Sequence, residues 1–220
     1  MAFFYANIME FIDEEIENYT IAHTNKEPKL LAELNRETWA TVMNPRMLSG
    51  HLQGRILSMF SKLIKPKRII EVGTYTGYSS LCLAEGLTKN GRLHTIDINE
   101  EYSSISKKYF NLSKHKQKIH QHIGNAINII PKIEDNFQLA FIDADKENYC
   151  SYFDLIAEKI DLYGYIIADN VLWSGKVTEL EKDKETKALD AYNKKVSSNK
   201  KFETLLLPVR DGLMISRKIG

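Results

Sequence analysis

The sequence has 220 residues, of which 43% are hydrophobic and 27% charged, and these values are typical of a globular protein rather than a disordered one. Lysine plus arginine number 30 and aspartate plus glutamate 29, so the net charge of +1 argues against a general nucleic-acid binder. The two cysteines, Cys82 and Cys150, are too few for a disulfide scaffold or a thiolate zinc site, and they favour a reduced, cytoplasmic setting. We expect no signal peptide, because no positively charged segment precedes a sustained apolar run near the first residues. We expect no membrane span, because no apolar run approaches the ~18 residues that a span requires.

The first 63 residues predict helices. Apolar residues recur at helical spacing from Ile8 to Ile16, and a second helix is expected to begin near Pro28 and to carry Trp39. Residues 52–63 predict a third helix. The apolar stripes of these helices are typical of core packing.

From Lys67 onward, short β-rich segments alternate with helical ones. We expect strands at 68–72, 92–96, 118–123, 139–142 and 165–168, and helices at 78–87, 100–112, 126–133 and 149–160. Such alternation requires crossover connections, and it therefore predicts a parallel sheet with helices on both of its faces.

The C-terminal part departs from this alternation. Residues 178–199 predict a solvated loop and helix, and two strands at 202–208 and 213–217 are joined across Asp211-Gly212, which is a hairpin signal. The sequence therefore predicts one α/β domain over residues 1–220. Its sheet is expected to be Rossmann-like, seven-stranded and mostly parallel, with a C-terminal antiparallel hairpin.

A glycine turn follows the first strand, in Glu71-Val-Gly-Thr-Tyr-Thr-Gly77. Ligands of open α/β sheets bind beyond the carboxyl ends of the strands, and Gly73 and Gly77 would let the backbone approach one closely. The middle glycine of a dinucleotide motif is missing, and Glu71 would repel a pyrophosphate. An amino acid moiety suits Glu71 together with Ser79 and the helix start, and S-adenosylmethionine carries such a moiety. The alternative is a plain tight turn.

Two further positions follow strands on the same predicted edge. Asp97 ends the second strand, where an acid can accept both hydroxyls of a ribose, although a helix N-cap is an equally good interpretation of this residue. Gly124-Asn125-Ala126 ends the third strand and would flank an adenine. Neither position distinguishes S-adenosylmethionine from NAD, because both ligands contain adenosine.

A carboxylate cluster is predicted where the fourth and fifth strands end. Asp143 follows the fourth strand, and Asp169 and Asn170 follow the fifth, 26 residues later. If these strands are neighbours, two carboxylates and an amide carbonyl converge. Such hard oxygen ligands suit Mg²⁺, Mn²⁺ or Ca²⁺ and disfavour zinc. The alternative is that these acids are helix N-caps, which is the interpretation that we prefer for Asp145.

Lys146 is a candidate general base, because it lies three residues beyond Asp143 near a predicted helix start. A positive helix end and a nearby metal ion would both disfavour its ammonium form. The alternative is a solvated surface charge. His120 and His122 point to one side of the third strand and could bind metal, but an exposed strand face is the better interpretation.

The chain resembles the cation-dependent class I S-adenosylmethionine O-methyltransferases, which include the caffeoyl-CoA and catechol O-methyltransferases. In its overall sequence character it is most similar to the bacterial members of this group. The resemblance runs from about Met47 to Arg217 and rests on four motifs. These motifs are Glu71-Val-Gly-Thr-Tyr-Thr-Gly-Tyr-Ser79, Phe141-Ile-Asp-Ala-Asp-Lys-Glu-Asn-Tyr149, Asp169-Asn-Val-Leu-Trp173 and Asp211-Gly212. Asn125 departs from the pattern, because an acid is frequent there.

The resemblance implies roles for individual residues. Contacts to S-adenosylmethionine are implied for Met47, Glu71, Gly73, Ser79, Asp97, Ala126 and Asp143. Metal ligation is implied for Asp143, Asp169 and Asn170, and catalytic roles are implied for Lys146, as the base, and for Asp143. Trp173 is implied to lie near the acceptor ring, although it could instead cap its loop. The helical region 1–63 is expected to contact the acceptor and a second subunit of a homodimer, and residues 67–218 to form the cofactor-binding core.

We therefore predict a metal-dependent, S-adenosylmethionine-dependent O-methyltransferase that acts on a hydroxyl of a catechol-like phenolic acceptor, with Mg²⁺ as the favoured cation. Two alternatives are an NAD-dependent oxidoreductase and a non-catalytic nucleotide-binding module on the same fold. The glycine pattern and Glu71 argue against the first. The combination of a base with a metal-ligand set argues against the second, because a binding module requires neither.

Overall fold

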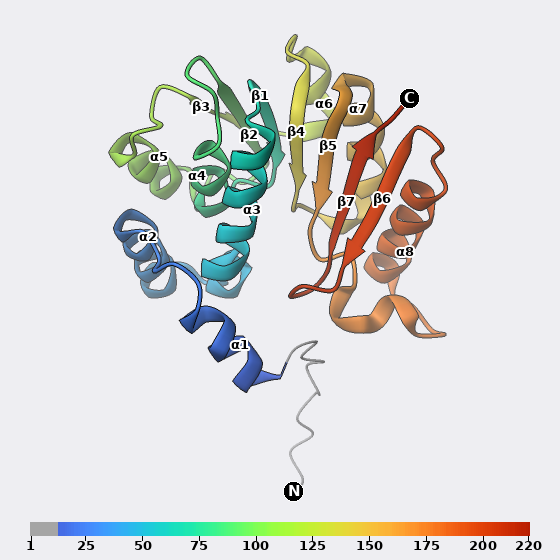
Figure 1. Cartoon of the computed structure of the whole chain (residues 1–220), viewed down its shortest axis with the longest axis horizontal. Helices are drawn as coiled ribbons and strands as arrows, with labels where there is room; N and C mark the ends of the chain where they lie inside the picture. Colours follow the sequence, from blue (N-terminus) through green and yellow to red (C-terminus); the bar gives the residue numbers. More distant parts are fainter. Residues whose placement is uncertain (1–12) are drawn as a thin grey trace, which may run out of the picture.

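A computed structural model of the protein describes residues 13–220, and Figure 1 shows their arrangement. Ile8, Phe11 and Ile12 of the first predicted helix lie outside the described residues. The described part of that region forms α1 (Glu14–Ala22), on which Ile16 is exposed. The second and third predicted helices are present as α2 (Lys29–Thr41) and α3 (Gly50–Ile64), and a short 3₁₀ turn, η1 (Pro45–Met47), connects them.

Seven strands form one sheet in the order β3-β2-β1-β4-β5-β7-β6. The strands are β1 (Arg68–Val72), β2 (Arg92–Asp97), β3 (Ile119–Ile123), β4 (Phe137–Ile142), β5 (Ile160–Ala168), β6 (Phe202–Leu207) and β7 (Leu213–Lys218). The first five are parallel, whereas β7 runs antiparallel to both β5 and β6. The predicted fold class, a mostly parallel sheet with a C-terminal antiparallel hairpin, is confirmed.

Helices cover both faces of the sheet. The remaining helices are α4 (Tyr78–Ala84), α5 (Ser103–Leu112), α6 (Ala126–Ile129), α7 (Tyr149–Lys159) and α8 (Lys184–Ser197), with 3₁₀ turns η2 (Ile130–Lys132), η3 (Lys146–Asn148) and η4 (Trp173–Thr178). One apolar core packs α2 to α5 against the sheet, and the other packs α6 to α8 against the opposite face. Because both faces are covered, β1 is buried from Ile69 to Val72 rather than alternating in burial.

Two of the differences between the predicted elements and the structure have a clear physical cause. The fifth strand begins at Ile160 rather than at residue 165, because Ile160 pairs with Phe137 across an irregularity in the ladder. Asp161 and Gly164 are residue types that are common in turns, which is why the strand was expected to begin after them. Tyr163, between them, has a positive φ of 66° although it lies within the strand. The predicted helix 126–133 is divided at residue 130, because Pro131 has no N–H to continue an α-helix.

The topology places the carboxyl ends of β1, β2, β4 and β5 along one edge of the sheet, which is the lower edge in Figure 1, where β5 ends and η4 begins. The central position of β1 beside β4 matters most, because it puts the glycine turn after β1 next to the acids after β4. Within residues 13–220, the helices are too short or too polar to cross a membrane.

Candidate active site

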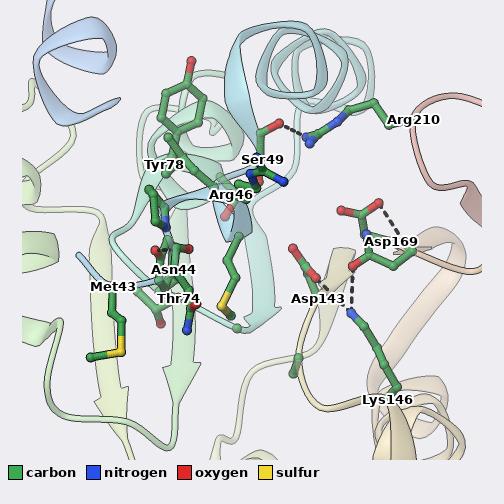
Figure 2. Close-up of a pocket in the computed structure, with 18 of the residues that line it drawn as sticks. Met43, Asn44, Arg46, Ser49, Thr74, Tyr78, Asp143, Lys146, Asp169 and Arg210 are labelled. Atoms are coloured by element: carbon green, nitrogen blue, oxygen red, sulfur yellow. Dashed lines mark hydrogen bonds and ion pairs between the residues drawn. The ribbon is translucent and has the colours of Figure 1, made fainter. Parts of the chain in front are cut away.

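A cavity of about 690 Å³ opens along the carboxyl edge of the sheet. Its walls come from residues 39–49, from the turn at 73–79, from residues 143–146 and 169–173, and from Arg210. Figure 2 shows Asp143, Lys146 and Asp169 together on one side of the cavity, with Met43, Asn44 and Thr74 on the other. The cavity therefore joins the glycine turn and the carboxylate cluster that the sequence had predicted separately.

The glycine turn packs directly on the backbone that follows β4. Gly73 and Gly77 have φ values of 106° and 93°, and Tyr75 between them has a φ of 50°. A Cβ atom at Gly73 would lie 1.8 Å from the carbonyl oxygen of Asp143. Glycine is therefore required at residue 73 both for its backbone conformation and for this close approach.

We expect Gly73→Ala to destabilise the protein by roughly 1–3 kcal/mol more than Gly50→Ala does, because the added methyl group must displace the Asp143 backbone. Gly50 is the matched control, since its φ is also positive, at 75°, but an added Cβ would meet only Arg210 at 4.0 Å. Denaturant unfolding of the two variants measures the difference. Equal destabilisation would show that the turn can move away from Asp143 freely.

Glu71 lies beneath this turn and is fully buried. Its Oε2 accepts a hydrogen bond from the Ser80 hydroxyl, whereas its buried Oε1 has no hydrogen-bond partner among residues 13–220. Burial raises the pKa of Glu71 to about 7, although the neighbouring Ser79 and Ser80 hydroxyls act in the opposite direction. An ammonium group beside this carboxylate would supply the missing donor and favour its ionised form.

The other predicted donor-site residues are divided between the cavity and its surroundings. Met47, Gly73, Ser79 and Asp143 line the cavity, whereas Glu71, Asp97 and Ala126 are not among its lining residues. Asp97 accepts hydrogen bonds from the backbone N–H groups of Tyr75 at 2.7 Å and Asn99 at 2.9 Å, so it also holds the glycine turn. Ala126 is the buried first residue of α6, and Asn125 caps that helix.

The carboxylate cluster forms as the neighbouring strands predict, because β4 pairs with β5. Asp169 is only 3% exposed, and its two oxygens accept hydrogen bonds from Gln53 Nε2 at 2.5 Å and from the Asn170 backbone N–H at 2.8 Å. Burial, and then the nearby charge of Asp143, raises the pKa of Asp169 to about 7. The site therefore concentrates negative charge where solvent screens it little.

Lys146 connects the members of this cluster. It lies on η3, is 8% exposed, and its Nζ donates hydrogen bonds to Asp143 Oδ1 at 3.2 Å, to Asn170 Oδ1 at 2.8 Å and to the Tyr149 hydroxyl at 2.8 Å. The alternative of a solvated surface lysine is wrong. A buried lysine amine that faces a cavity beside two carboxylates is a candidate for proton transfer.

The oxygen atoms of the cluster suit a divalent cation. Among the described residues, no group of three or more His, Cys, Asp or Glu side chains could hold a metal ion. The candidate set instead combines two carboxylates, Asp143 and Asp169, with the amide oxygen of Asn170. These hard oxygens fit Mg²⁺, and a cation among them would offset the repulsion that raises the pKa of Asp169.

Trp173 lies on a strained loop beside the cluster. Asn170, Trp173, Ser174 and Gly175 all have positive φ values, and the Asp211-Gly212 hairpin turn supports the loop through hydrogen bonds to Leu172 and Ser174. The centre of the Trp173 ring lies 5.6 Å from Lys146 Nζ. The loop thus places the Trp173 ring in the wall of the cavity. The free energy that these positive φ values cost is typical of segments that carry function.

Three residues of the site received no role from the sequence. Tyr149 contacts Lys146, Gln53 contacts Asp169, and Arg210 lines the cavity. Gln53 is a polar residue in the apolar stripe of α3, and this interruption was the one signal that could have identified it. His120 and His122 line no part of the cavity, and His122 instead lies 2.9 Å from a ring nitrogen of His94.

Comparison with known proteins agrees with this geometry. The family model described as O-methyltransferase matches residues 21–219. Caffeoyl-CoA O-methyltransferase from Petroselinum crispum is 31% identical over 208 residues, covering 89% of this chain and 86% of the relative. Caffeoyl-CoA O-methyltransferase 2 from Petunia hybrida is 32% identical, with the same two coverages.

Solved structures share the fold over nearly the whole chain. The SAH-bound methyltransferase PaMTH1 from Podospora anserina superimposes with a TM-score of 0.86 at 26% identity, covering 95% of this chain and 97% of that one. The O-methyltransferase from Bacillus cereus in complex with SAH has a TM-score of 0.86 at 23% identity, with coverages of 93% and 97%. The chain belongs to the O-methyltransferase family, which confirms the predicted family and the predicted enzyme class.

Proposed function

We propose that this enzyme transfers the methyl group of S-adenosylmethionine to one hydroxyl of a catechol-like phenolic acceptor, with the help of a divalent cation. The observation that carries the proposal is the convergence of Lys146, Asp143, Asp169 and Asn170 beside the glycine turn, in one cavity. The relatives named caffeoyl-CoA O-methyltransferases support an acceptor of this class. The related structures that hold SAH support the methyl donor.

The donor is assigned to the end of the cavity at the glycine turn. Glu71 Oε1, which has no partner within residues 13–220, would accept from the ammonium of the methionine moiety. Gly73 and Ser79 would contact this moiety from the cavity wall. Met47 lines the same cavity. Asp97 would accept from the ribose hydroxyls, and Ala126 would lie near the adenine.

We expect Glu71→Gln to weaken SAH binding by roughly 10- to 100-fold, because a charge-assisted hydrogen bond contributes about 1.5–3 kcal/mol. The variant should fold at least as stably without ligand, since it removes a buried carboxylate and keeps an acceptor for Ser80. Calorimetric titration and thermal melts measure the two effects, and Glu179→Gln on the exposed surface is the control. Unchanged SAH affinity would contradict the role of Glu71.

The acceptor is assigned to the end of the cavity at the carboxylate cluster. Asp143, Asp169 and Asn170 would hold Mg²⁺, which when bound lowers the pKa of an acceptor hydroxyl and orients it. Lys146 would take the hydroxyl proton on Nζ. The acceptor oxygen then bonds to the methyl carbon as the carbon–sulfur bond breaks, leaving S-adenosylhomocysteine. Asp143, next to Gly73, lies between the two reactants and helps to position both.

The remaining walls suit a flat aromatic acceptor. Trp173 faces Lys146, and Trp39 and Met43 contribute exposed apolar surface at the cavity mouth. Trp39 and Met43 belong to the N-terminal helical region, which supports its predicted contact with the acceptor. The homodimer, the cytoplasmic location and the division into regions 1–63 and 67–218 stay predictions.

The test of this proposal is methyl transfer from labelled S-adenosylmethionine to free catechols, caffeic acid, caffeoyl-CoA and catechol flavonoids, each with Mg²⁺ and with EDTA. We expect transfer to at least one acceptor, and we expect EDTA to abolish it. Transfer that is indifferent to EDTA would overturn the role of the metal ion. Binding of a nicotinamide cofactor without SAH binding would favour the oxidoreductase alternative.

A further inference from the structure

Gln53 connects the carboxylate cluster to a distant part of the chain. It lies on α3 and is only 2% exposed, although α3 is otherwise buried through apolar and small side chains. Its Nε2 donates to Asp169 Oδ2 at 2.5 Å, and its Oε1 accepts from Arg210 Nη1 at 2.7 Å. One buried amide thus bridges a carboxylate at the end of β5 and a guanidinium in the loop between β6 and β7.

The chemistry of the two partners determines which way the Gln53 amide points. An arginine side chain has only donors, and an ionised carboxylate has only acceptors, so the amide oxygen must face Arg210 and the amide nitrogen must face Asp169. A reversed amide would lose both hydrogen bonds. Arg210 therefore holds the Gln53 donor toward Asp169, without contacting Asp169 through a hydrogen bond of its own.

Arg210 is itself held at the start of α3. Its Nη1 also donates to the backbone carbonyl of Ser49, a contact that is marked in Figure 2. Its φ of 51° lies in the left-handed region, which costs a non-glycine residue free energy. The loop thus accepts an unfavourable backbone conformation at the residue whose side chain reaches across to Gln53.

We propose that Gln53 and Arg210 are positioning residues that hold the Asp169 carboxylate in the orientation required to bind a divalent cation. This inference rests on the proposed function, because that function places the cation on Asp143, Asp169 and Asn170. Asp169 Oδ1 accepts from the Asn170 backbone N–H, and Asp169 Oδ2 accepts from the Gln53 amide, so one lone pair on each oxygen is occupied. Together they restrict rotation of the carboxylate and direct its remaining lone pairs.

The charge of Arg210 and its hydrogen bond have opposite effects on a cation, which makes the inference testable. A positive charge near the site repels the cation, so its removal alone would tighten binding. Loss of the hydrogen bond to Gln53 would weaken binding, because residues that orient metal ligands typically contribute roughly 10- to 100-fold to affinity. We expect the second effect to be larger, because Gln53 is buried and is the side-chain donor to Asp169 Oδ2.

The test is the dissociation constant of Mn²⁺, measured by electron paramagnetic resonance on the full chain without donor or acceptor. We expect Gln53→Met to weaken Mn²⁺ binding by roughly 10-fold or more. Arg210→Gly should weaken it in the same direction while preserving the melting temperature, since glycine readily adopts the left-handed backbone. Arg36→Ala removes an exposed arginine that does not line the cavity, and it should leave the Mn²⁺ affinity unchanged.

A double variant distinguishes positioning from a general structural effect. If Arg210 acts through Gln53, adding Arg210→Gly to Gln53→Met should weaken Mn²⁺ binding no further, and SAH affinity should stay near that of the wild type in all variants. Wild-type affinity in either single variant, or additive losses in the double variant, would overturn the inference. No Mn²⁺ binding by the wild-type protein would overturn it together with the proposed metal site.

Discussion

Lys146→Ala is expected to lower kcat by roughly 100- to 10,000-fold, the range that a positioned general base contributes. Lys146 is the amine that faces the cavity between Asp143 and Asn170, at 3.2 and 2.8 Å from their Oδ1 atoms. Removing it takes away the amine, while the nearby carboxylates are assigned to the cation. SAH affinity should change little, because the donor is assigned to the glycine turn. Initial rates with labelled S-adenosylmethionine and calorimetry with SAH measure the two quantities separately.

The variant Lys146→Arg tests whether Lys146 is needed to accept a proton or only to supply a positive charge. Arginine keeps the positive charge and hydrogen-bond donors but does not lose its proton in proteins, so this variant should be nearly as slow as the alanine variant. Lys184→Ala is the matched control, because that side chain is 80% exposed and pairs with Glu147 on the surface. Near-normal turnover in Lys146→Ala would remove this residue from its proposed role.

Asp169→Asn is expected to reduce activity by roughly three orders of magnitude and to abolish its dependence on Mg²⁺, because a metal ion supplies several kcal/mol of charge stabilisation. The substitution keeps the size of the side chain but removes the charge that would hold the cation. Activity assays at increasing Mg²⁺ and with EDTA provide the measurement. Full activity that persists in EDTA would contradict the metal-assisted mechanism.

Although Asp169→Asn is expected to lower activity, it should raise the stability of the metal-free protein relative to wild type at neutral pH. The pKa of Asp169 is raised to about 7 in the folded protein, above its usual value near 3.8. The folded state therefore holds this proton more tightly, so ionisation of Asp169 costs stability progressively as the pH rises from about 4 to 7. Metal-free Asp169→Asn lacks this cost, and its melting temperature relative to wild type should increase between pH 5 and pH 8. A constant difference across this range would contradict the raised pKa.

The sequence by itself determined the order of the elements. Alternating β-rich and helical segments predicted the strands and the helices on both faces, because apolar periodicity and turn residues act locally. It also determined the glycine turn and the strand-end acids, since the motifs around Glu71, Asp143 and Asp169 each lie within a few residues. Strand β5 was predicted too short, because its start depends on pairing with β4 rather than on its own composition.

Only the tertiary structure decided which of these residues meet. Pairing of β4 with β1 and β5 brings Gly73, Asp143 and Asp169 to one cavity, and it buries Lys146 among their neighbours. Gln53 lies 116 residues from Asp169 and 157 from Arg210 in sequence, yet it touches both. No local spacing encodes such contacts. They follow from strand order and from the packing of α3 on the sheet, which are properties of the whole folded chain.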